Sequence, residues 1–316
     1  MMTDIGASVA AGAAAPGDRA KLVAEVSARV GSSREAGWIV DHAMAAAAFT
    51  APLTAPLTAP PTIPWAAALA LADRRAAGEP LQYVLGIWAF RSLELAIDRR
   101  VLIPRAETEQ VVEVALGELA RIARGRSAED GSLVCVDLGT GSGAIALALA
   151  SEGVPSGRPL EVWATDASTD ALDVARANRD ALAASDPVAA GRVTFVQGSW
   201  FDALPDRLVH RVDLIVSNPP YVAEEEYDDL EPTVREWEPR HALVAARGRS
   251  GVAGLADIES VVAGSGAWLA RSGVLVVELA PSQAYGAIDA ARRAGLSRVE
   301  TARDLAGRLR MLVAER

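Results

Sequence analysis

The fold is decided by the stretch VDLGTGSG at residues 136–143, which follows an apolar run that begins at Leu133. The apolar run predicts a buried strand, and a second apolar run after the glycines predicts a helix. Glycines at such a junction let the backbone turn tightly and approach a ligand, because they carry no Cβ atom. The stretch therefore predicts a ligand-binding turn. By itself it is also compatible with a nicotinamide enzyme, since Gly139, Gly141 and Ala144 satisfy the relaxed dinucleotide fingerprint.

The pattern of strand, turn and helix repeats toward the C-terminus. Strands are predicted at 133–138, 161–165, 193–197, 212–217 and 273–279, with two more at 297–302 and 308–314. Helices are predicted at 144–152, 169–184, 254–270 and 282–294. Such alternation is typical of an α/β fold whose sheet is mostly parallel and doubly wound. Its ligand site should lie at the carboxyl ends of the strands, near the first strand.

The first part of the chain follows a helical pattern. Helices are predicted at 17–30, at 33–48 and from Pro64 to Gly78. The repeat TAPLTAPLTAP at 50–60 precedes the third helix, and proline at this density blocks both helix and sheet pairing. It predicts an extended loop over 50–64.

Residues 87–105 differ from the segments on either side. Apolar runs at 87–90 and 93–97 predict paired strands, and a helix should begin at about Glu107. The chain is therefore predicted to comprise a helical N-terminal domain at 1–86, a β-hairpin connector at 87–105 and an α/β domain at 106–316.

Composition excludes several classes of protein. Hydrophobic residues make up 51% and charged residues 23%, and no apolar run approaches the ~18 residues of a membrane span. Cys135 is the single cysteine, which excludes an internal disulfide and a cysteine-built zinc site, and the three histidines are scattered. We therefore expect a cytoplasmic protein with no bound metal and no membrane contact. The net charge of -10 argues against direct nucleic-acid binding.

Two further positions are candidates for contact with a nucleotide-like ligand. Asp166 ends the second predicted strand, where its carboxylate can accept hydrogen bonds from ribose hydroxyls. Trp200 follows the third strand, where its ring can pack against an adenine. The alternatives are a solvated surface aspartate and an ordinary core tryptophan.

The motif that decides the reaction is SNPPYV at 217–222, which follows the fourth strand. Its two prolines fix the backbone, so that the Asn218 side chain and the Pro219 carbonyl point in fixed directions, and Tyr221 closes the pocket. An amide or aryl amine is a poor nucleophile because its lone pair is delocalised. Two oxygen acceptors can each take one N–H, orient the nitrogen toward a methyl sulfonium and stabilise its growing positive charge. This chemistry favours a methyltransferase, because a nicotinamide dehydrogenase has no use for the motif.

At this point the sequence resembles the protein-(glutamine-N5) methyltransferases that modify peptide-chain release factors. The resemblance covers residues 78–316. It rests on GEPLQYVLG at 78–86, LIPRAETE at 102–109, DLGTGSG at 137–143, GSWF at 198–201, NPPY at 218–221, EPR at 238–240 and DLAGR at 304–308. Ala106, Ser250 and the pair Leu279-Ala280 depart from the family's pattern, but none of them lies in the NPPY motif.

The resemblance implies a class I S-adenosylmethionine-dependent methyltransferase, Rossmann-like, with a small helical N-terminal domain that docks the substrate. The implied acceptor is the glutamine of the Gly-Gly-Gln motif in class 1 release factors. Catalysis is assigned to Asn218, Pro219 and Tyr221, and the substrate glutamine is held by these three together with Pro220. The implied donor site consists of Gly139, Thr140, Gly141, Ser142, Gly143, Asp166, Trp200 and Asn218. The segment 107–109 would border the methionine end of the donor, or else serve as ordinary acidic helix capping.

Two rival functions stay open. An adenine-N6 methyltransferase acting on RNA or DNA faces the same problem of a delocalised lone pair. The acidic run EEEYDDLE at 224–231 argues against it, because such a run beside the active site would repel phosphates. The second rival, of another class, is a catalytically inactive nucleotide-binding scaffold, which the intact NPPY motif disfavours.

Overall fold

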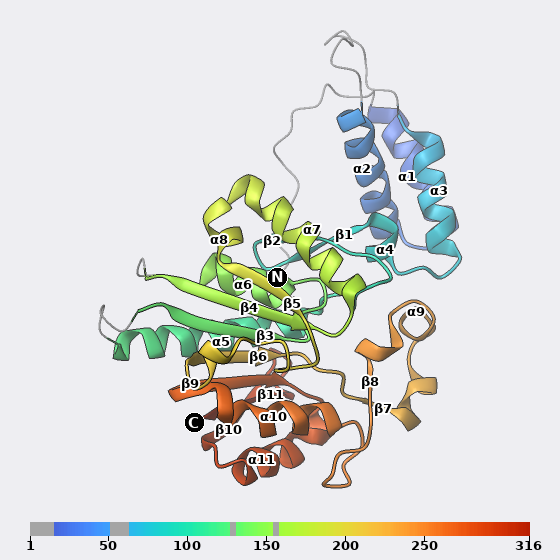
Figure 1. The fold of residues 1–316 in the computed structure, drawn as a ribbon. Coiled ribbons are helices and arrows are strands. Elements are labelled where there is room, and N and C mark those ends of the chain that lie inside the picture. Colours follow the sequence, from blue (N-terminus) through green and yellow to red (C-terminus); the bar gives the residue numbers. More distant parts are fainter. Residues whose placement is uncertain (1–15, 51–62, 127–130, 154–157) are drawn as a thin grey trace. The chain divides into compact units, whose positions relative to one another are not determined.

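The computed structural model describes residues 16–50, 63–126, 131–153 and 158–316, and it divides the chain into two compact units, Met1–Leu85 and Gly86–Arg316 (Figure 1). Except for Thr50, the Thr-Ala-Pro repeat lies outside the described residues, so the loop over 50–64 stays a prediction. None of the helices in the described segments is long and apolar enough to cross a membrane.

The N-terminal unit is helical, as its sequence predicts. It contains α1 (Pro16–Val30), α2 (Ser33–Thr50), α3 (Trp65–Ala76) and the short α4 (Leu81–Leu85), which was not predicted. Leu22 and Val26 of α1 pack with Ile39 and Val40 of α2 and Ala68 of α3 in a separate apolar core. This core forms because each helix buries one apolar stripe against the other two.

The second unit opens with an antiparallel hairpin of β1 (Ile87–Phe90) and β2 (Leu93–Ala96). Its backbone is tied to a distant helix by Asn178, which accepts a hydrogen bond from Ala96 N at 2.7 Å and donates one to Ala96 O at 3.1 Å. The same side chain donates to Ser142 O at 2.9 Å. One buried amide therefore joins the hairpin to the glycine-rich turn.

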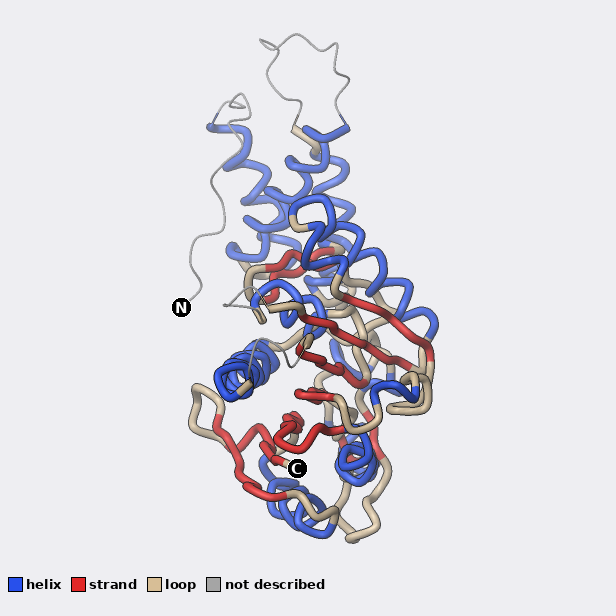
Figure 2. The backbone as a smooth tube through the Cα atoms, turned by 60° about the vertical axis from the view of Figure 1, so that its left-hand side comes forward, coloured by secondary structure: helices blue, strands red, loops and turns tan. Residues whose placement is uncertain are grey.

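A sheet forms the centre of this unit (Figures 1 and 2). It has seven strands, in the order β10-β11-β9-β6-β3-β4-β5. Its strands are β3 (Leu133–Leu138), β4 (Leu160–Asp166), β5 (Val193–Gln197), β6 (Val212–Ser217), β9 (Leu269–Glu278), β10 (Ser297–Arg303) and β11 (Leu309–Glu315). Five neighbouring strands pair in parallel, from β9 through β6, β3 and β4 to β5. Strand β11 runs antiparallel to both β9 and β10. The prediction of a mostly parallel sheet is confirmed.

Helices cover both faces of this sheet. They are α5 (Ala106–Gly125), α6 (Ala144–Glu152), α7 (Thr169–Ser185), α10 (Ala256–Trp268) and α11 (Ala284–Arg293). All were predicted, with ends that differ by a few residues. The structure adds α8 (Pro187–Gly191), α9 (Pro232–Arg235) and a two-residue strand pair, β7 (Val222–Ala223) with β8 (Val244–Ala245), which periodicity does not reveal because the elements are so short.

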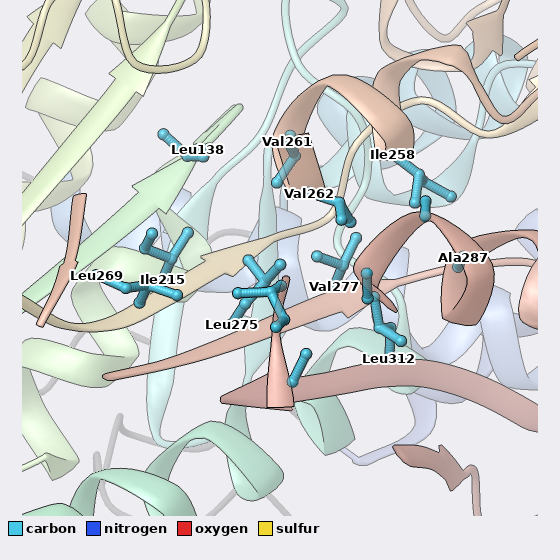
Figure 3. Packing of buried hydrophobic residues seen from close by; sticks show 14 of the residues in the cluster. Leu138, Ile215, Ile258, Val261, Val262, Leu269, Leu275, Val277, Ala287 and Leu312 are labelled. Atoms are coloured by element: carbon cyan, nitrogen blue, oxygen red, sulfur yellow. The ribbon is translucent and has the colours of Figure 1, made fainter. Parts of the chain in front are cut away.

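An apolar core of the second unit lies between the sheet and the helices α10 and α11 (Figure 3). Leu138, Ile215 and Leu275 come from three adjacent strands, and Ile258 and Val262 of α10 pack against them. Strands covered on both faces need apolar side chains at every position, which explains why they appear in the sequence as continuous apolar runs. Cys135, on β3, is fully buried and unpaired by any disulfide, as expected of a strand thiol.

Candidate active site

A cavity of about 330 Å³ opens at the carboxyl ends of β3, β4, β5 and β6. Its wall contains Gly139, Thr140, Gly141, Ser142, Asp166, Trp200, Asn218 and Pro220 from the predicted site. Three other predicted residues, Gly143, Pro219 and Tyr221, are not among those that line it. The glycine turn and the NPPY motif therefore meet at one cavity, which follows from the adjacency of β3 and β6 in the sheet.

The glycine turn has a conformation that other residues would not adopt without strain. Gly139 has a φ of 73°, and a Cβ atom placed on it would lie 3.4 Å from Cζ3 of Trp200. Gly143 has a φ of 84° and starts α6, where a Cβ would crowd Ala175, Leu147 and Phe195 at 3.3 Å. Gly143 therefore serves close packing of the helix, whereas Gly139 serves the cavity wall.

Asp166 lies at the tip of β4 and its carboxylate is already anchored. Its Oδ2 accepts a hydrogen bond from Gly141 N at 2.9 Å, and its Oδ1 accepts one from Ser168 N at 2.9 Å. Each carboxylate oxygen can accept a second bond. The aspartate thus fixes the glycine turn and keeps acceptor capacity toward the cavity.

Trp200 is half-buried in the cavity wall, with a φ of 47°, unusual for a residue with a side chain. The Thr165 hydroxyl donates to Trp200 O at 2.8 Å. This bond ties the backbone of Trp200 to the end of β4, where its ring lies close to Gly139. The ring is therefore held as part of the cavity wall, and it also packs against the apolar core.

A buried acid beneath the glycine turn was not singled out from the sequence. Asp137 is fully buried, and its Oδ2 accepts bonds from the Thr140 hydroxyl at 2.6 Å and from Ala146 N at 3.1 Å. Its Oδ1 is buried without a hydrogen-bond partner among the described residues. Burial raises the pKa of Asp137 to about 7, and the nearby Asp166 adds to the shift. The sequence signal that could have indicated this residue is its place as the one acid within the stretch VDLGTGSG.

The NPPY motif is held in place by the segment that follows α9. Tyr221 N and Val222 N both donate to Leu243 O, at 3.2 and 2.9 Å. On the other side, Gln283 donates to Tyr221 O at 2.8 Å. Pro219 is buried and is not among the residues that line the cavity. These bonds fix the backbone on both sides of the motif, in addition to the rigidity of its prolines.

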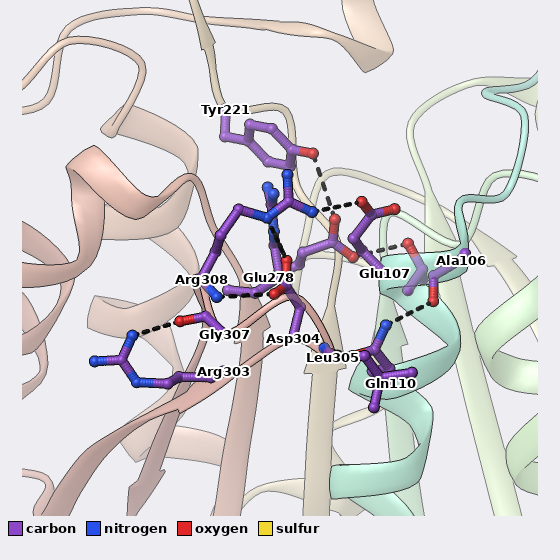
Figure 4. A network of polar contacts seen from close by, with 12 residues as sticks. Ala106, Glu107, Gln110, Tyr221, Glu278, Arg303, Asp304, Leu305, Gly307 and Arg308 are labelled. Atoms are coloured by element: carbon purple, nitrogen blue, oxygen red, sulfur yellow. Dashed lines mark hydrogen bonds and ion pairs between the residues drawn. The ribbon is translucent and has the colours of Figure 1, made fainter.

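A chain of hydrogen bonds runs from Asn218 through Thr108, which also lines the cavity, to Glu278. Asn218 Nδ2 donates to Thr108 Oγ1 at 3.2 Å, and Thr108 Oγ1 donates to Glu278 Oε2 at 2.8 Å. The Tyr221 hydroxyl donates to the other oxygen of Glu278 at 3.4 Å, as Figure 4 shows. Burial raises the pKa of Glu278 to about 7, against the opposing effects of Thr108 and Arg310. Tyr221 thus reaches the site through Glu278 rather than through the cavity wall.

The sequence motifs on either side of this chain of hydrogen bonds also pair with each other. Glu238 is buried, accepts a bond from Ile103 N at 3.1 Å and forms an ion pair with Arg105. Near the C-terminus, Arg308 pairs with Asp304 at 2.7 Å and with Glu107 at 3.0 Å (Figure 4). Glu107 is therefore engaged by an arginine from the last hairpin, a partner that neither sequence interpretation of segment 107–109 included.

Several residues of the cavity wall were given no site role from the sequence. They are Arg100, Leu102, Pro104, His241 and Asp257. The first three lie in or just before the LIPRAETE stretch. Thr108, also in the wall, belongs to the segment 107–109, which the resemblance placed beside the methionine end of the donor. His241 and Asp257 lie in segments without a recognisable motif, so only the folded chain brings them to the cavity.

The acidic run is less negative than its sequence suggests. Glu224 forms an ion pair with Arg240, and Glu225 forms one with Arg247. Within the described part of the chain, no ion pair involves the other four acids of the run, which are exposed: Glu226, Asp228, Asp229 and Glu231. The expected repulsive rim is therefore reduced to these four carboxylates.

Comparison with known proteins identifies the family. A family model described as "Methyltransferase small domain" matches residues 127–233. The release factor glutamine methyltransferase of Rhodopirellula baltica is 38% identical over 244 residues, which cover 77% of this chain and 75% of that protein. The protein of the same name from Burkholderia pseudomallei is 42% identical over 240 residues, 75% of this chain and 76% of that protein. The chain belongs to the release factor glutamine methyltransferase family.

Membership confirms the resemblance drawn from the motifs and excludes a nicotinamide dehydrogenase. With its mostly parallel sheet, the chain has the class I methyltransferase fold. The matched family model covers residues 127–233, which include the glycine turn and the acidic run. No cluster of three or more potential metal ligands occurs among the described residues.

Proposed function

We propose that the protein transfers a methyl group from S-adenosylmethionine to the side-chain amide nitrogen of the glutamine in the Gly-Gly-Gln motif of class 1 release factors. One observation carries the proposal: Asn218 and the glycine turn with Asp166 line the same cavity. The names of the relatives support release factors as the substrate class. A substrate of the translation machinery also supports a cytoplasmic location.

The cavity has the features that an adenosyl ligand requires. Its volume of about 330 Å³ lies within the ~300–1,000 Å³ typical of small-molecule sites. Asp166 offers acceptors for the ribose hydroxyls, and the Trp200 ring offers a flat apolar surface for the adenine. Gly139 and Gly141 carry no Cβ atom, which lets the backbone come close to the ligand. When bound, S-adenosylmethionine supplies an electrophilic methyl group on a sulfonium.

The acceptor side must hold an amide nitrogen and stabilise positive charge on it. The Asn218 Oδ1 and the Pro219 carbonyl would each accept one N–H of the substrate glutamine. As the nitrogen attacks, its N–H groups become stronger donors, so these two bonds strengthen in the transition state. The methylated nitrogen then loses a proton readily, so no dedicated base is needed.

The direct test uses labelled S-adenosylmethionine and a purified class 1 release factor, followed by mass mapping of the product. We expect a single methyl group on the Gly-Gly-Gln glutamine and none on a release factor whose glutamine is replaced by alanine. Label that instead appears in an added RNA or DNA adenine would establish the rival activity. Binding of the donor without transfer to any amide or amine would establish the scaffold.

Neutralising unpaired carboxylates of the acidic run should have opposite effects on the methylation of a release factor and of a nucleic acid. Asp228→Asn, Asp229→Asn and Glu231→Gln together should lower kcat/KM for a release factor by roughly two- to fivefold at low salt, because a basic partner loses electrostatic attraction. Physiological salt should shrink the effect, since screening acts over about 8–10 Å. The measurement is the initial rate at two salt concentrations.

A matched variant separates the rim from net charge. Asp206→Asn, Asp289→Asn and Glu300→Gln neutralise three exposed acids on other elements and should leave kcat/KM unchanged. The protein assignment is contradicted if the rim variant methylates nucleic acid faster, as reduced phosphate repulsion would allow, with no loss on the release factor.

A further inference from the structure

The side-chain amide of Asn218 ends in an oxygen and an NH2 group, which differ chemically. Only one of the two can bind the amide nitrogen of the substrate. Its Oδ1 accepts hydrogen bonds and its Nδ2 donates them. Only the oxygen can accept an N–H from a substrate amide. With the amide turned over, two NH2 groups would face each other and repel. Rotation by half a turn about the last side-chain bond exchanges the two, so an orienting group is required.

Resting on the proposed function, we propose that Thr108 and Glu278 are positioning residues that hold the Asn218 amide with its oxygen turned toward the substrate glutamine. Thr108 comes from the first turn of α5 and Glu278 from the last residue of β9. Both are buried, with 4% and 1% of their surface exposed. From the sequence, Glu278 had no assigned role, and Thr108 was placed only within the segment 107–109 that would border the donor.

The orientation of the Asn218 amide follows from the number of hydrogen atoms that the groups of this hydrogen-bond chain can donate. An ionised carboxylate only accepts hydrogen bonds, so Glu278 must receive the hydrogen of Thr108 across the 2.8 Å contact. The Thr108 hydroxyl has a single hydrogen, so toward Asn218 it presents a lone pair. Only the NH2 group can donate to that lone pair, across the 3.2 Å contact. The Oδ1 of Asn218 is thereby left on the side away from Thr108.

The second oxygen of Glu278 is also occupied by a donor. The Tyr221 hydroxyl reaches Glu278 Oε1 at 3.4 Å (Figure 4). Glu278 therefore accepts one hydrogen bond from Tyr221 and one from Thr108, which in turn accepts one from Asn218. Both ends of the NPPY motif are thus linked to the same carboxylate. This arrangement gives Tyr221, which does not line the cavity, a function in positioning the motif.

The relay depends on Glu278 being ionised, which gives it a pH signature. The groups that face Glu278 are Thr108 and Glu107 from α5, Tyr221 from the loop after β6 and Arg310 from β11. Burial raises the pKa of Glu278 to about 7 in the donor-free protein. Below that pH the carboxyl gains a hydrogen of its own and can donate to Thr108. The hydroxyl is then no longer obliged to accept from Asn218, and the amide orientation is released.

Two substitutions at one position separate the hydroxyl from the packing. Thr108→Val keeps the shape and removes the hydroxyl, whereas Thr108→Ser keeps the hydroxyl and removes a methyl group. Thr108→Val should lower kcat on the release factor roughly tenfold, the effect of one hydrogen bond, and leave the donor Kd within about threefold. Thr108→Ser should restore kcat to within about threefold of the parent. A purely structural role would give the opposite order or equal losses.

A second readout needs no release factor. The chain has two asparagines, Asn178 and Asn218, so protein labelled with 15N-asparagine shows two side-chain NH2 pairs. Asn218→Ala assigns one pair, and the fully bonded Asn178 is the internal reference. We expect the Asn218 pair to move in Thr108→Val and to stay in Thr108→Ser. In the parent it should also move as the pH falls through about 7, and this step should vanish in Thr108→Val. A step kept in that variant belongs to Asp137, whose pKa is also about 7, and contradicts the pH signature.

The two readouts distinguish failure of the relay from failure of the proposed function. A parent protein that leaves the release factor unmethylated, but shows the expected resonance shifts, contradicts the function and leaves the orientation of Asn218 established. A parent that methylates the glutamine, while valine and serine at 108 behave alike in kcat and in the spectrum, overturns the relay.

Discussion

Asn218→Ala should reduce turnover on a release factor by roughly 10²–10³, the usual cost of removing one preorganised hydrogen bond to a transition state. The loss is expected in kcat because the bond to the attacking nitrogen strengthens as charge develops. Alanine also removes the NH2 group that occupies Thr108 at 3.2 Å. The measurement is single-turnover methylation with saturating donor.

Donor binding is the control for this substitution. Calorimetry should give a Kd for S-adenosylmethionine within about tenfold of the parent, since one neutral contact contributes about 0.5–1.5 kcal/mol. A variant that retains more than half of the parental turnover removes Asn218 from the catalytic role. A variant that loses donor binding altogether would show that Asn218 acts mainly in the donor site.

Asp166→Ala should weaken binding of S-adenosylmethionine by about 1.5–3 kcal/mol, the range for hydrogen bonds to a charged group, or roughly 10–150-fold in Kd. Two effects of the substitution both weaken donor binding. The ribose loses its acceptors, and Gly141 N and Ser168 N lose the carboxylate oxygens that hold the turn at 2.9 Å. Calorimetry on the folded variant measures the change.

Two matched variants identify the cause. Asp166→Asn keeps one acceptor oxygen and should lose less affinity than alanine. Asp170→Asn removes the same charge from an exposed position in the first turn of α7 and should leave the Kd unchanged. Equal donor affinity in the parent and in folded Asp166→Ala would exclude Asp166 from the site.

Much of the fold could be predicted because its signals are local. Helices and buried strands differ in the spacing and length of their apolar runs, and this part of the reading agrees closely with the observed elements. The glycine turn and the NPPY motif could be placed at one edge of the sheet, since parallel strands present their carboxyl ends together. The short pair β7 and β8 escaped prediction because two-residue strands have no periodicity.

For the candidate site, the sequence placed some residues in the cavity wall correctly and others not. Four predicted residues lie in the cavity wall as expected, because each lies at or just after the carboxyl end of a parallel strand: Gly139, Asp166, Trp200 and Asn218. Tyr221 does not, since its backbone is turned by bonds to Leu243 and its hydroxyl reaches Glu278 instead. The acidic run illustrates the same limit: its charge is visible in the sequence, but the arginines that pair with Glu224 and Glu225 lie 16 and 22 residues away.

The sequence by itself determined the order of helices and strands, the position of the nucleotide turn and the residue types that methylate an amide, because these depend on neighbours along the chain. Only the tertiary structure decided which groups orient Asn218. Thr108 lies 110 residues from Asn218 and 170 from Glu278, and a hydrogen bond depends on positions within a few tenths of an ångström. Packing of α5 beside β6 and β9 brings the three together, and no local pattern specifies that contact.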